Sequence, residues 1–203
     1  MNKLAIAFVA LAFVTVTAIS QASNPQPALP KCNLTEATAP SVRGLRLGMS
    51  TQQLLALFPG SSKRREMKSA VDMANAATGN EAAYLVFDPA TDGDAKQFSG
   101  VDSVSAGLNK GRVIDFSIQY GGVTWSDIDE WVAKLSESLK LQGAGDWTVG
   151  PSENPNKILR CEGIEIEAAI QGGGSSIRIR NTEYGKVADR NAADEKKRRD
   201  IKP

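Results

Sequence analysis

The side chains that could carry covalent or acid–base chemistry in this chain are two cysteines and 23 acidic residues, and the chain has no histidine. Without histidine, Ser-His-Asp and Cys-His nucleophiles and histidine metal sites are excluded. A pair of carboxylates could still hydrolyse a glycosidic bond. The acidic residues, however, fall mostly on predicted solvent-facing positions or in loops, and their spacing singles out no pair. We therefore expect a protein that is not an enzyme, and a carboxylate-dependent hydrolase remains the catalytic alternative.

A polar stretch at residues 88–100 is the nearest approach to a metal motif. Its aspartates Asp88, Asp92 and Asp94 have spacings similar to those of a calcium-binding loop, but the third and twelfth positions are Ala90 and Ser99. Two of the oxygen ligands that such a loop needs are therefore missing. We expect a polar loop here, and no metal ion or other cofactor.

The two cysteines, Cys32 and Cys161, are the remaining reactive side chains, and they lack both a CxxC spacing and a histidine partner. We expect them to form a disulfide that joins the segment before the first helix to a late strand, provided that the chain is exported. Closing a loop of this length stabilises a fold by roughly 3–5 kcal/mol in the chain-entropy model.

Residues 1–22 predict that export. Lys3 precedes an apolar run that begins at Leu4, and the stretch ends in Ser20-Gln21-Ala22, which is typical of a signal peptide cleaved before Ser23. Since no cysteine lies at that cleavage site, we expect no lipid anchor. The predicted location is the periplasm or the extracellular medium, with no membrane span once the signal is removed.

The rest of the chain has the length and charge of one compact domain. Loss of Lys3 with the signal would leave 23 basic and 23 acidic residues, so nothing in the charge balance favours nucleic acid as a partner. Residues 23–41 predict an extended lead-in, 42–182 a single domain, and 183–203 a charged tail that is frayed or disordered. The sequence does not indicate an oligomeric state.

The best-defined element is a helix that begins after Ser50. Gln53 completes a capping box with Ser50, Met49 and Leu54 have the spacing of a hydrophobic staple, and Pro59-Gly60 ends the helix. A second helix is predicted within 61–80 and a third from Ser126. Predicted strands are Ala83–Phe87, Val101–Leu108, Arg112–Tyr120, Lys157–Cys161, Ile164–Ile170 and Ser176–Asn181, with the loop Gly143–Pro155 between them.

The capped helix also carries a family resemblance. The motif Gly48-Met49-Ser50-x-x-Gln53-Leu54-x-x-Leu57 resembles the start of two related bacterial groups. These are the BamE/SmpA (OmlA) family of outer-membrane-assembly lipoproteins and the β-lactamase inhibitor protein-like domains. The resemblance covers about a dozen residues, and the absence of a lipoprotein cysteine departs from the BamE pattern. It implies helices packed on one face of an antiparallel sheet, and the second group implies a tandem arrangement.

Alternating side chains predict how the sheet divides into two faces. Ile114, Phe116, Ile118 and Tyr120 would pack on one face, and the polar residues between them would lie on the other. If 172–175 is a hairpin turn, Glu167 faces Arg180 across the last strand pair. The fold class is therefore α+β, with an antiparallel sheet of about six strands and helices on one face. A helix followed by three strands occurs twice, in Ser50–Tyr120 and Ser126–Asn181.

These features favour an exported, non-catalytic binding module that docks an unidentified protein partner. We expect exposed aromatic residues on the uncovered sheet face to bind that partner, and the candidates are Tyr120, Trp125 and Trp147. The alternative is a small-molecule or lipid carrier, which requires an apolar cavity between the helices and the sheet.

Overall fold

The structure is a computed structural model that describes residues 32–76, 82–122, 125–141, 146–172 and 174–184. The predicted signal peptide, much of the lead-in and nearly all of the charged tail lie outside the described residues. The strands are β1 (Ala83–Phe87), β2 (Val101–Asn109), β3 (Arg112–Tyr120), β4 (Trp147–Val149), β5 (Asn156–Arg160), β6 (Ile164–Gln171) and β7 (Gly174–Asn181). The α-helices are α1 (Thr51–Leu57), α2 (Arg65–Ala76), α3 (Pro89–Asp92) and α4 (Ile128–Leu139), and 3₁₀ helices span Glu36–Thr38 and Pro59–Lys63.

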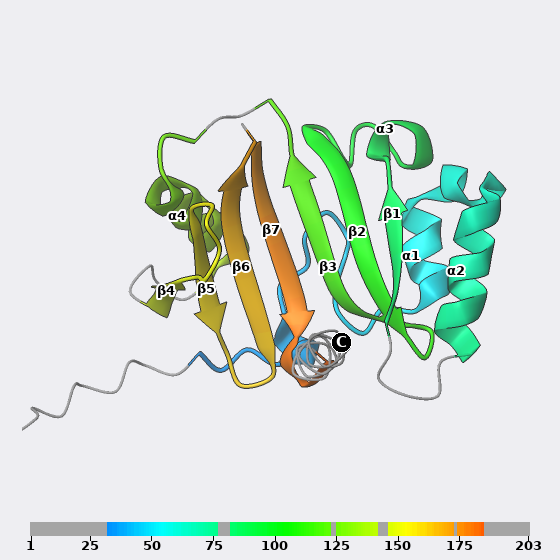
Figure 1. Ribbon diagram of the computed structural model, residues 1–203, viewed down its shortest axis with the longest axis horizontal. Coiled ribbons are helices and arrows are strands. Elements are labelled where there is room, and N and C mark those ends of the chain that lie inside the picture. The colour runs from blue at the N-terminus through cyan, green and yellow to red at the C-terminus, as the bar shows by residue number, and fades with distance from the viewer. Residues whose placement is uncertain (1–31, 77–81, 123–124, 142–145, 173, 185–203) are drawn as a thin grey trace, which may run out of the picture.

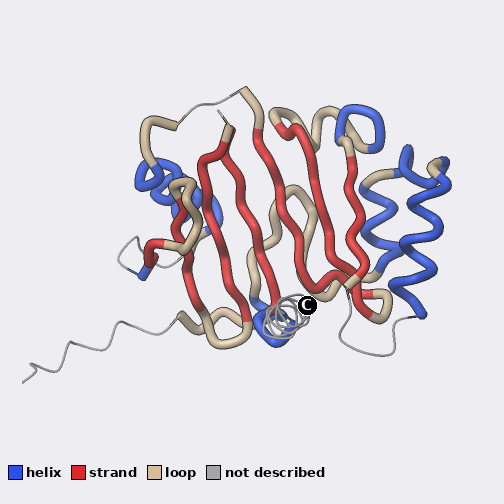
Figure 2. Tube along the Cα trace, in the orientation of Figure 1, coloured by secondary structure: helices blue, strands red, loops and turns tan. Residues whose placement is uncertain are grey.

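All seven strands form one antiparallel sheet in the order β1-β2-β3-β7-β6-β5-β4. The α+β class is confirmed, with one strand more than expected. The order places two blocks side by side, each made of consecutive strands and preceded by helices, and joins them through β3 and β7 (Figure 1). Figure 2 shows the strands alongside one another, with helices at the flanks of the sheet and behind it.

The predicted capping of the first helix is confirmed. The Ser50 hydroxyl accepts a hydrogen bond from the Gln53 backbone N–H (3.2 Å), and the Gln53 side chain accepts one from the Ser50 N–H (2.9 Å). Met49 and Leu54 are both buried, as the staple requires. The α-helix ends at Leu57, and the chain continues into the 3₁₀ helix that begins at Pro59.

The expected start of α4 is wrong by one residue. Asp127 is the N-cap and accepts from the Glu130 N–H (2.8 Å), whereas the Ser126 hydroxyl donates to the Glu130 carboxylate (2.6 Å). An ionised carboxylate is a stronger acceptor than a hydroxyl for the N–H groups of a first turn, which accounts for the difference. The helix buries Trp131, Val132 and Leu135.

The β2–β3 hairpin turns through two residues, Lys110 and Gly111, both with positive φ (49° and 70°). Such turns match the twist of the strands that they join. A register shift follows, since Gly107 pairs with Asp115 but Leu108 pairs with Val113. Val113 therefore joins the core while Ile114, predicted for the packed face, is buried outside it.

The expected pairing of Glu167 with Arg180 is wrong. Glu167 lies opposite Arg178, and Glu165 lies opposite Arg180. The reason is the turn, because Gln171 pairs with Gly174 and leaves two residues between the strands instead of four. A slip of two residues keeps every side chain on its own face, so the alternation of charges is preserved.

Two segments differ from expectation in the environment of their side chains. Trp147 lies in the short strand β4 and not in a loop, opposite Leu159, and it is 6% exposed. Ala83–Phe87 is not a fully buried strand, because β1 is an edge strand. Leu85 and Phe87 face the core, whereas Tyr84 and Val86 are 51% and 60% exposed.

The core lies between one face of this sheet and the helices. Helices α1 and α2 cover the block of β1, β2 and β3, and α4 covers β5 and β6. The segment before α1 completes the layer with Val42, Leu45 and Leu47, which are buried. In Figure 1 this segment passes behind the sheet, so the reader looks at the opposite face. Within the described residues, no helix combines the length and hydrophobicity needed to cross a bilayer.

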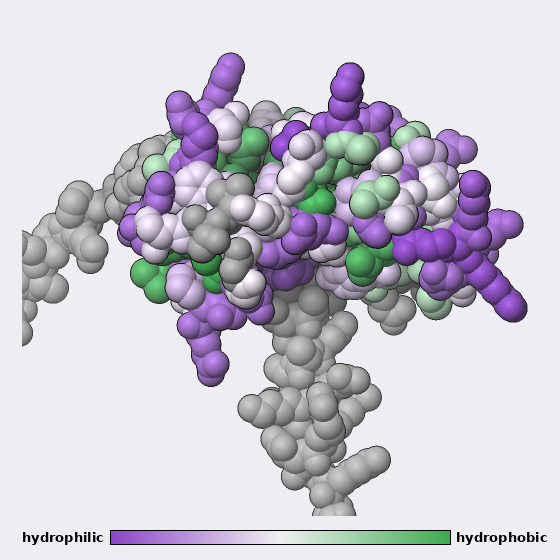
Figure 3. Space-filling model, turned by 90° about the horizontal axis from the view of Figure 1, so that it is seen from above, coloured by the Kyte–Doolittle hydropathy of each residue, from purple (hydrophilic) through white to green (hydrophobic). Residues whose placement is uncertain are grey.

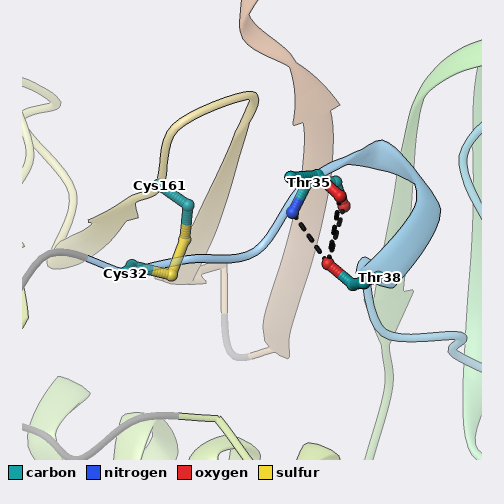
Figure 4. Close-up of a disulfide and its surroundings, with 4 residues drawn as sticks. All are labelled: Cys32, Thr35, Thr38 and Cys161. Atoms are coloured by element: carbon teal, nitrogen blue, oxygen red, sulfur yellow. Dashed lines mark hydrogen bonds between the residues drawn. A yellow bond between two sulfur atoms is a disulfide. The ribbon is translucent and has the colours of Figure 1, made fainter.

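The disulfide between Cys32 and Cys161 is present, with the two Cα atoms 4.6 Å apart (Figure 4). It fastens the start of the described chain next to the end of β5, across 129 residues. Nearby, Thr35 and Thr38 close a short turn, in which the Thr35 N–H donates to the Thr38 hydroxyl (2.9 Å).

Removing this cross-link should be costly. We predict that the double variant Cys32→Ala/Cys161→Ala loses about 3–5 kcal/mol in the free energy of unfolding, because the denatured chain regains the entropy of a long loop. Urea denaturation of the wild type with and without reductant, beside the variant, measures this loss. Equal midpoints for oxidised and reduced wild type would contradict it.

Candidate functional site

A pocket of about 430 Å³ opens where β3, β7 and the loop before β2 meet the N-terminal segment and α4. Arg43 lies on its rim, held by a tight turn in which Val42 and Leu45 exchange both backbone hydrogen bonds (3.0 and 2.9 Å). Arg43 and Gly44 both have positive φ (55° and 87°), which glycine adopts without strain. The turn therefore presents Arg43 outward from the core.

Three hydrogen bonds fix the position of Arg43. Its guanidinium donates to the backbone oxygens of Gln97 (3.1 Å) and Ser99 (3.2 Å). The Gln97 side chain in turn donates to the Arg43 backbone oxygen (2.7 Å). The guanidinium also hydrogen-bonds the Tyr120 side chain, and its five N–H groups exceed these contacts among the described residues.

An aromatic cluster forms the wall of the pocket. Trp131 of α4 contacts Tyr120 edge-on, with ring centroids 5.5 Å apart, and contacts Trp125 at 5.2 Å. The Trp131 indole N–H donates to the Ser176 backbone oxygen (3.0 Å), which fixes the ring on the sheet. Leu139 extends the apolar surface along α4. Because the rings pack on one another, the wall is a preformed apolar surface.

Ser175 lies at the inner side of the pocket. The β3–β7 register places it opposite Tyr120, and it is 1% exposed. Its hydroxyl has no hydrogen-bond partner among the described residues. A buried hydroxyl without a hydrogen-bond partner costs free energy. A ligand atom that hydrogen-bonds the Ser175 hydroxyl would remove this cost.

The pocket carries one charge. Arg43 is the only ionisable side chain besides Tyr120 among its described lining residues, and none of those is acidic. Burial raises the pKa of the Tyr120 hydroxyl above its ordinary value, and the Arg43 guanidinium opposes part of that rise. Figure 3 looks down on this end of the molecule, where hydrophobic areas interrupt the hydrophilic surface.

The opposite sheet face is polar and is held together by ion pairs. Across β3 and β7, Asp115 accepts from the Arg178 guanidinium at Nε (3.0 Å) and also at Nη2. The Tyr84 ring lies over Gly107, where a Cβ would come within 3.0 Å of it. Asp115 raises the pKa of Arg178 further above its ordinary value. Both side chains are therefore held in place by each other.

A second set of ion pairs continues along β5, β6 and β7. Glu165 accepts from Arg180 (2.7 Å) and from Arg160 (3.2 Å), and is itself buried. The Asn156 amide donates to Glu167 (2.8 Å). The uncovered face therefore presents a continuous row of oriented charges that runs across four strands.

The three predicted binding residues do not gather on that uncovered face. Trp147 is buried against the helix side of the sheet, while Tyr120 and Trp125 are half-buried in the pocket wall.

The sequence reasoning missed Arg43 and Ser175. A signal existed for Arg43 in the following glycine, which favours a left-handed turn. Ser175 offered none, because its role depends on the pairing of distant strands.

The buried acidic side chains of the described face are engaged by arginines. Asp115 and Glu165 lie on strands that flank β7, and each is bound by a guanidinium. Both carboxylates are therefore occupied as hydrogen-bond acceptors of arginine side chains. Within the described ranges, no cluster of three or more His, Cys, Asp or Glu residues could hold a metal ion.

Comparisons with known proteins add no family. The chain matches no protein-family model, no curated protein and no solved structure. The resemblance of the Gly48–Leu57 motif to two bacterial groups stays a prediction.

The Asp115–Arg178 pair should be strongly coupled. We predict that Asp115→Ala lowers the free energy of unfolding by about 1–3 kcal/mol, because it removes the hydrogen-bonded carboxylate partner of a half-buried guanidinium. The double variant Asp115→Ala/Arg178→Ala should lose less than the sum of the single variants. Denaturant unfolding of the four proteins measures this coupling. The exposed pair Lys134–Glu137 is the matched control and should show no measurable coupling. Additive losses at Asp115 and Arg178 would contradict the prediction.

Tyr120 should make stability depend on pH in the alkaline range. Its pKa is higher in the folded than in the unfolded chain, so its contribution is fully present below about pH 10 and is lost as the pH rises through the folded pKa. We predict that Tyr120→Phe loses less stability than the wild type above pH 10. Denaturation midpoints measured from pH 8 to pH 11.5 test this, and parallel curves would contradict it.

Proposed function

We propose that this protein is an exported, non-catalytic binding module that docks a protein partner on its uncovered sheet face. The observation that carries the proposal is the arrangement of the layers. Helices α1, α2 and α4 all pack on one side of the seven-stranded sheet, and the other side carries a row of ordered polar side chains. The partner is proposed to be a folded protein, because the face is broad and formed by seven adjacent strands.

The size of the face supports this proposal. Strands lie about 4.8 Å apart with a rise near 3.3 Å per residue, so this sheet offers roughly 750 Å² on one side. A stable protein–protein interface buries about 800 Å² per partner. The face is therefore about as large as a complete interface, without help from loops.

The chemistry of the face also supports it. Asp115, Glu165 and their arginines already occupy fixed positions, so a partner would bind without first ordering them. At one end of the row, Tyr84 and Val86 offer exposed apolar surface. Oriented charges beside an aromatic and an aliphatic residue are the composition of many protein interfaces.

Binding on the face is favoured over pairing with the edge of β1. The Arg64 guanidinium donates to the Val86 backbone oxygen (2.7 Å) and forms an ion pair with Asp92 (2.9 Å). An edge carbonyl that is occupied in this way is not free to pair with an added strand. The exposed side chains of β1, Tyr84 and Val86, in contrast, remain accessible on the uncovered sheet face.

Export and lack of catalysis are part of the same proposal. The Cys32–Cys161 disulfide is compatible with an oxidising compartment, and the predicted signal peptide supplies the route. The arginine-bound carboxylates of the uncovered face support a binding role for it and argue against a hydrolase.

One substitution on this face should weaken docking. In a cross-linked pull-down from envelope and extracellular fractions, we predict that the mature chain, Ser23–Pro203, captures one protein in stoichiometric amount. Val86→Asp should weaken that capture by about tenfold or more, because it places an unpaired charge in a desolvated contact. Quantitative mass spectrometry of the captured protein measures the change.

Val149→Asp is the matched control. Val149 is 81% exposed on the side of β4 that faces away from the docking surface, as shown by its neighbour Trp147, which is buried under the helices. The same charge there should leave capture unchanged. Equal capture by wild type and Val86→Asp, or equal loss with Val149→Asp, would contradict the proposal.

A further inference from the structure

The pocket at the other side of the sheet is not used by the proposed docking face. Tyr120 and Ser175 point to the helix side, whereas Gln119 and Ser176, their neighbours in the strands, belong to the uncovered face. A cavity of about 430 Å³ is within the range that holds drug-sized molecules. The pocket therefore needs an explanation of its own.

The walls favour a flat apolar body. Trp125, Trp131 and Leu139 present aromatic and aliphatic surface on one side of the cavity. Because Trp131 is fixed to the Ser176 backbone oxygen, this surface does not have to be ordered when a ligand binds. Burial of an apolar ring against it would provide most of the affinity.

The polar groups favour an acceptor on that body. The Arg43 guanidinium has five N–H groups, which exceed its hydrogen bonds to Gln97, Ser99 and the Tyr120 hydroxyl among the described residues. The Ser175 hydroxyl is buried and without a partner among the described residues, and it lines the same cavity. An anionic group could accept from Arg43 at the rim, while a second polar atom of the ligand satisfies Ser175 inside.

The same arrangement disfavours a cationic ligand. An aromatic cage for a quaternary ammonium needs ring faces that surround an empty centre. Here Tyr120 and Trp125 both pack against Trp131, with centroids 5.5 and 5.2 Å away. The guanidinium of Arg43 would also repel a second cation, and none of the described lining residues is acidic.

We propose that this pocket binds a small amphipathic molecule, which carries a flat apolar ring system and one anionic group. The ring system lies against Trp125 and Trp131, the anion meets Arg43, and Ser175 bonds to a polar atom of the ligand. This assigns a ligand site to the protein that is independent of the protein-docking face.

Two fluorescent probes that differ in one group test the proposal. The anionic probe is 8-anilinonaphthalene-1-sulfonate, and N-phenyl-1-naphthylamine has the same rings without the sulfonate. In titrations of the mature disulfide-bonded protein, the anionic probe should bind with a stoichiometry of one. Its affinity should exceed that of the neutral probe by about tenfold or more, the value of a charge-assisted hydrogen bond.

Three variants separate the contacts. Arg43→Asn keeps a residue that tolerates a positive φ and should bring the two probes to within about twofold of one another. Trp125→Ala should weaken both probes by about tenfold through lost ring contact. Ser175→Ala should weaken the anionic probe while leaving the melting temperature of the free protein unchanged or raised, because a buried unpaired hydroxyl is removed.

A control and the adverse outcomes complete the test. Val86→Asp, on the other face, should bind both probes like the wild type. The proposal is overturned if neither probe saturates, or if Trp125→Ala binds both probes unchanged. It is also overturned if the probes bind equally to the wild type, or if benzyltrimethylammonium displaces the anionic probe. Should Arg43→Asn fail to fold, the comparison of the two probes on the wild type and on Ser175→Ala still decides the question.

Discussion

The pairing of β3 with β7 is the contact on which the rest of this molecule depends. It joins two blocks of strands that each have their own helices, and its register decides what lies on both faces. On the helix side, Phe116 lies opposite Ile179 in the core, and Tyr120 lies opposite Ser175 in the pocket. On the uncovered side, the same pairing brings Asp115 within reach of Arg178. A register slip of one residue would exchange the two faces and destroy both surfaces.

The helix prediction that the structure confirms rests on a pattern of neighbouring residues. The capping box of Ser50 and Gln53 needs only a few neighbouring residues to form. The register of β6 and β7 was not predictable in this way, because two turns fit the glycine-rich stretch after Gln171 and both keep the same alternation. Trp147 was assigned to a loop, since three residues are too few to show a strand period.

The candidate sites required contacts that no local pattern encodes. The pocket is lined by Arg43, Tyr120 and Ser175, which come from three distant parts of the chain. Tyr120 and Trp125 were expected on the uncovered sheet face, but they lie in the pocket on the helix side. The alternation along β3 already places Tyr120 on the packed face with Phe116 and Ile118, whereas Trp125 follows the strand and its side depends on the packing of α4. The disulfide was predictable from the sequence, because a chain with two cysteines allows one intramolecular pairing.

The central claim is that the uncovered sheet face docks a protein, and site-specific photocross-linking tests it most directly. A photoreactive amino acid would replace Ser105 or Gln119, which lie on that face, and Lys134 on the outer surface of α4 would serve as the control position. The account predicts one shared cross-linked product from the two sheet positions and none from α4. Cross-links from Lys134 to the same protein, with none from the sheet positions, would contradict it.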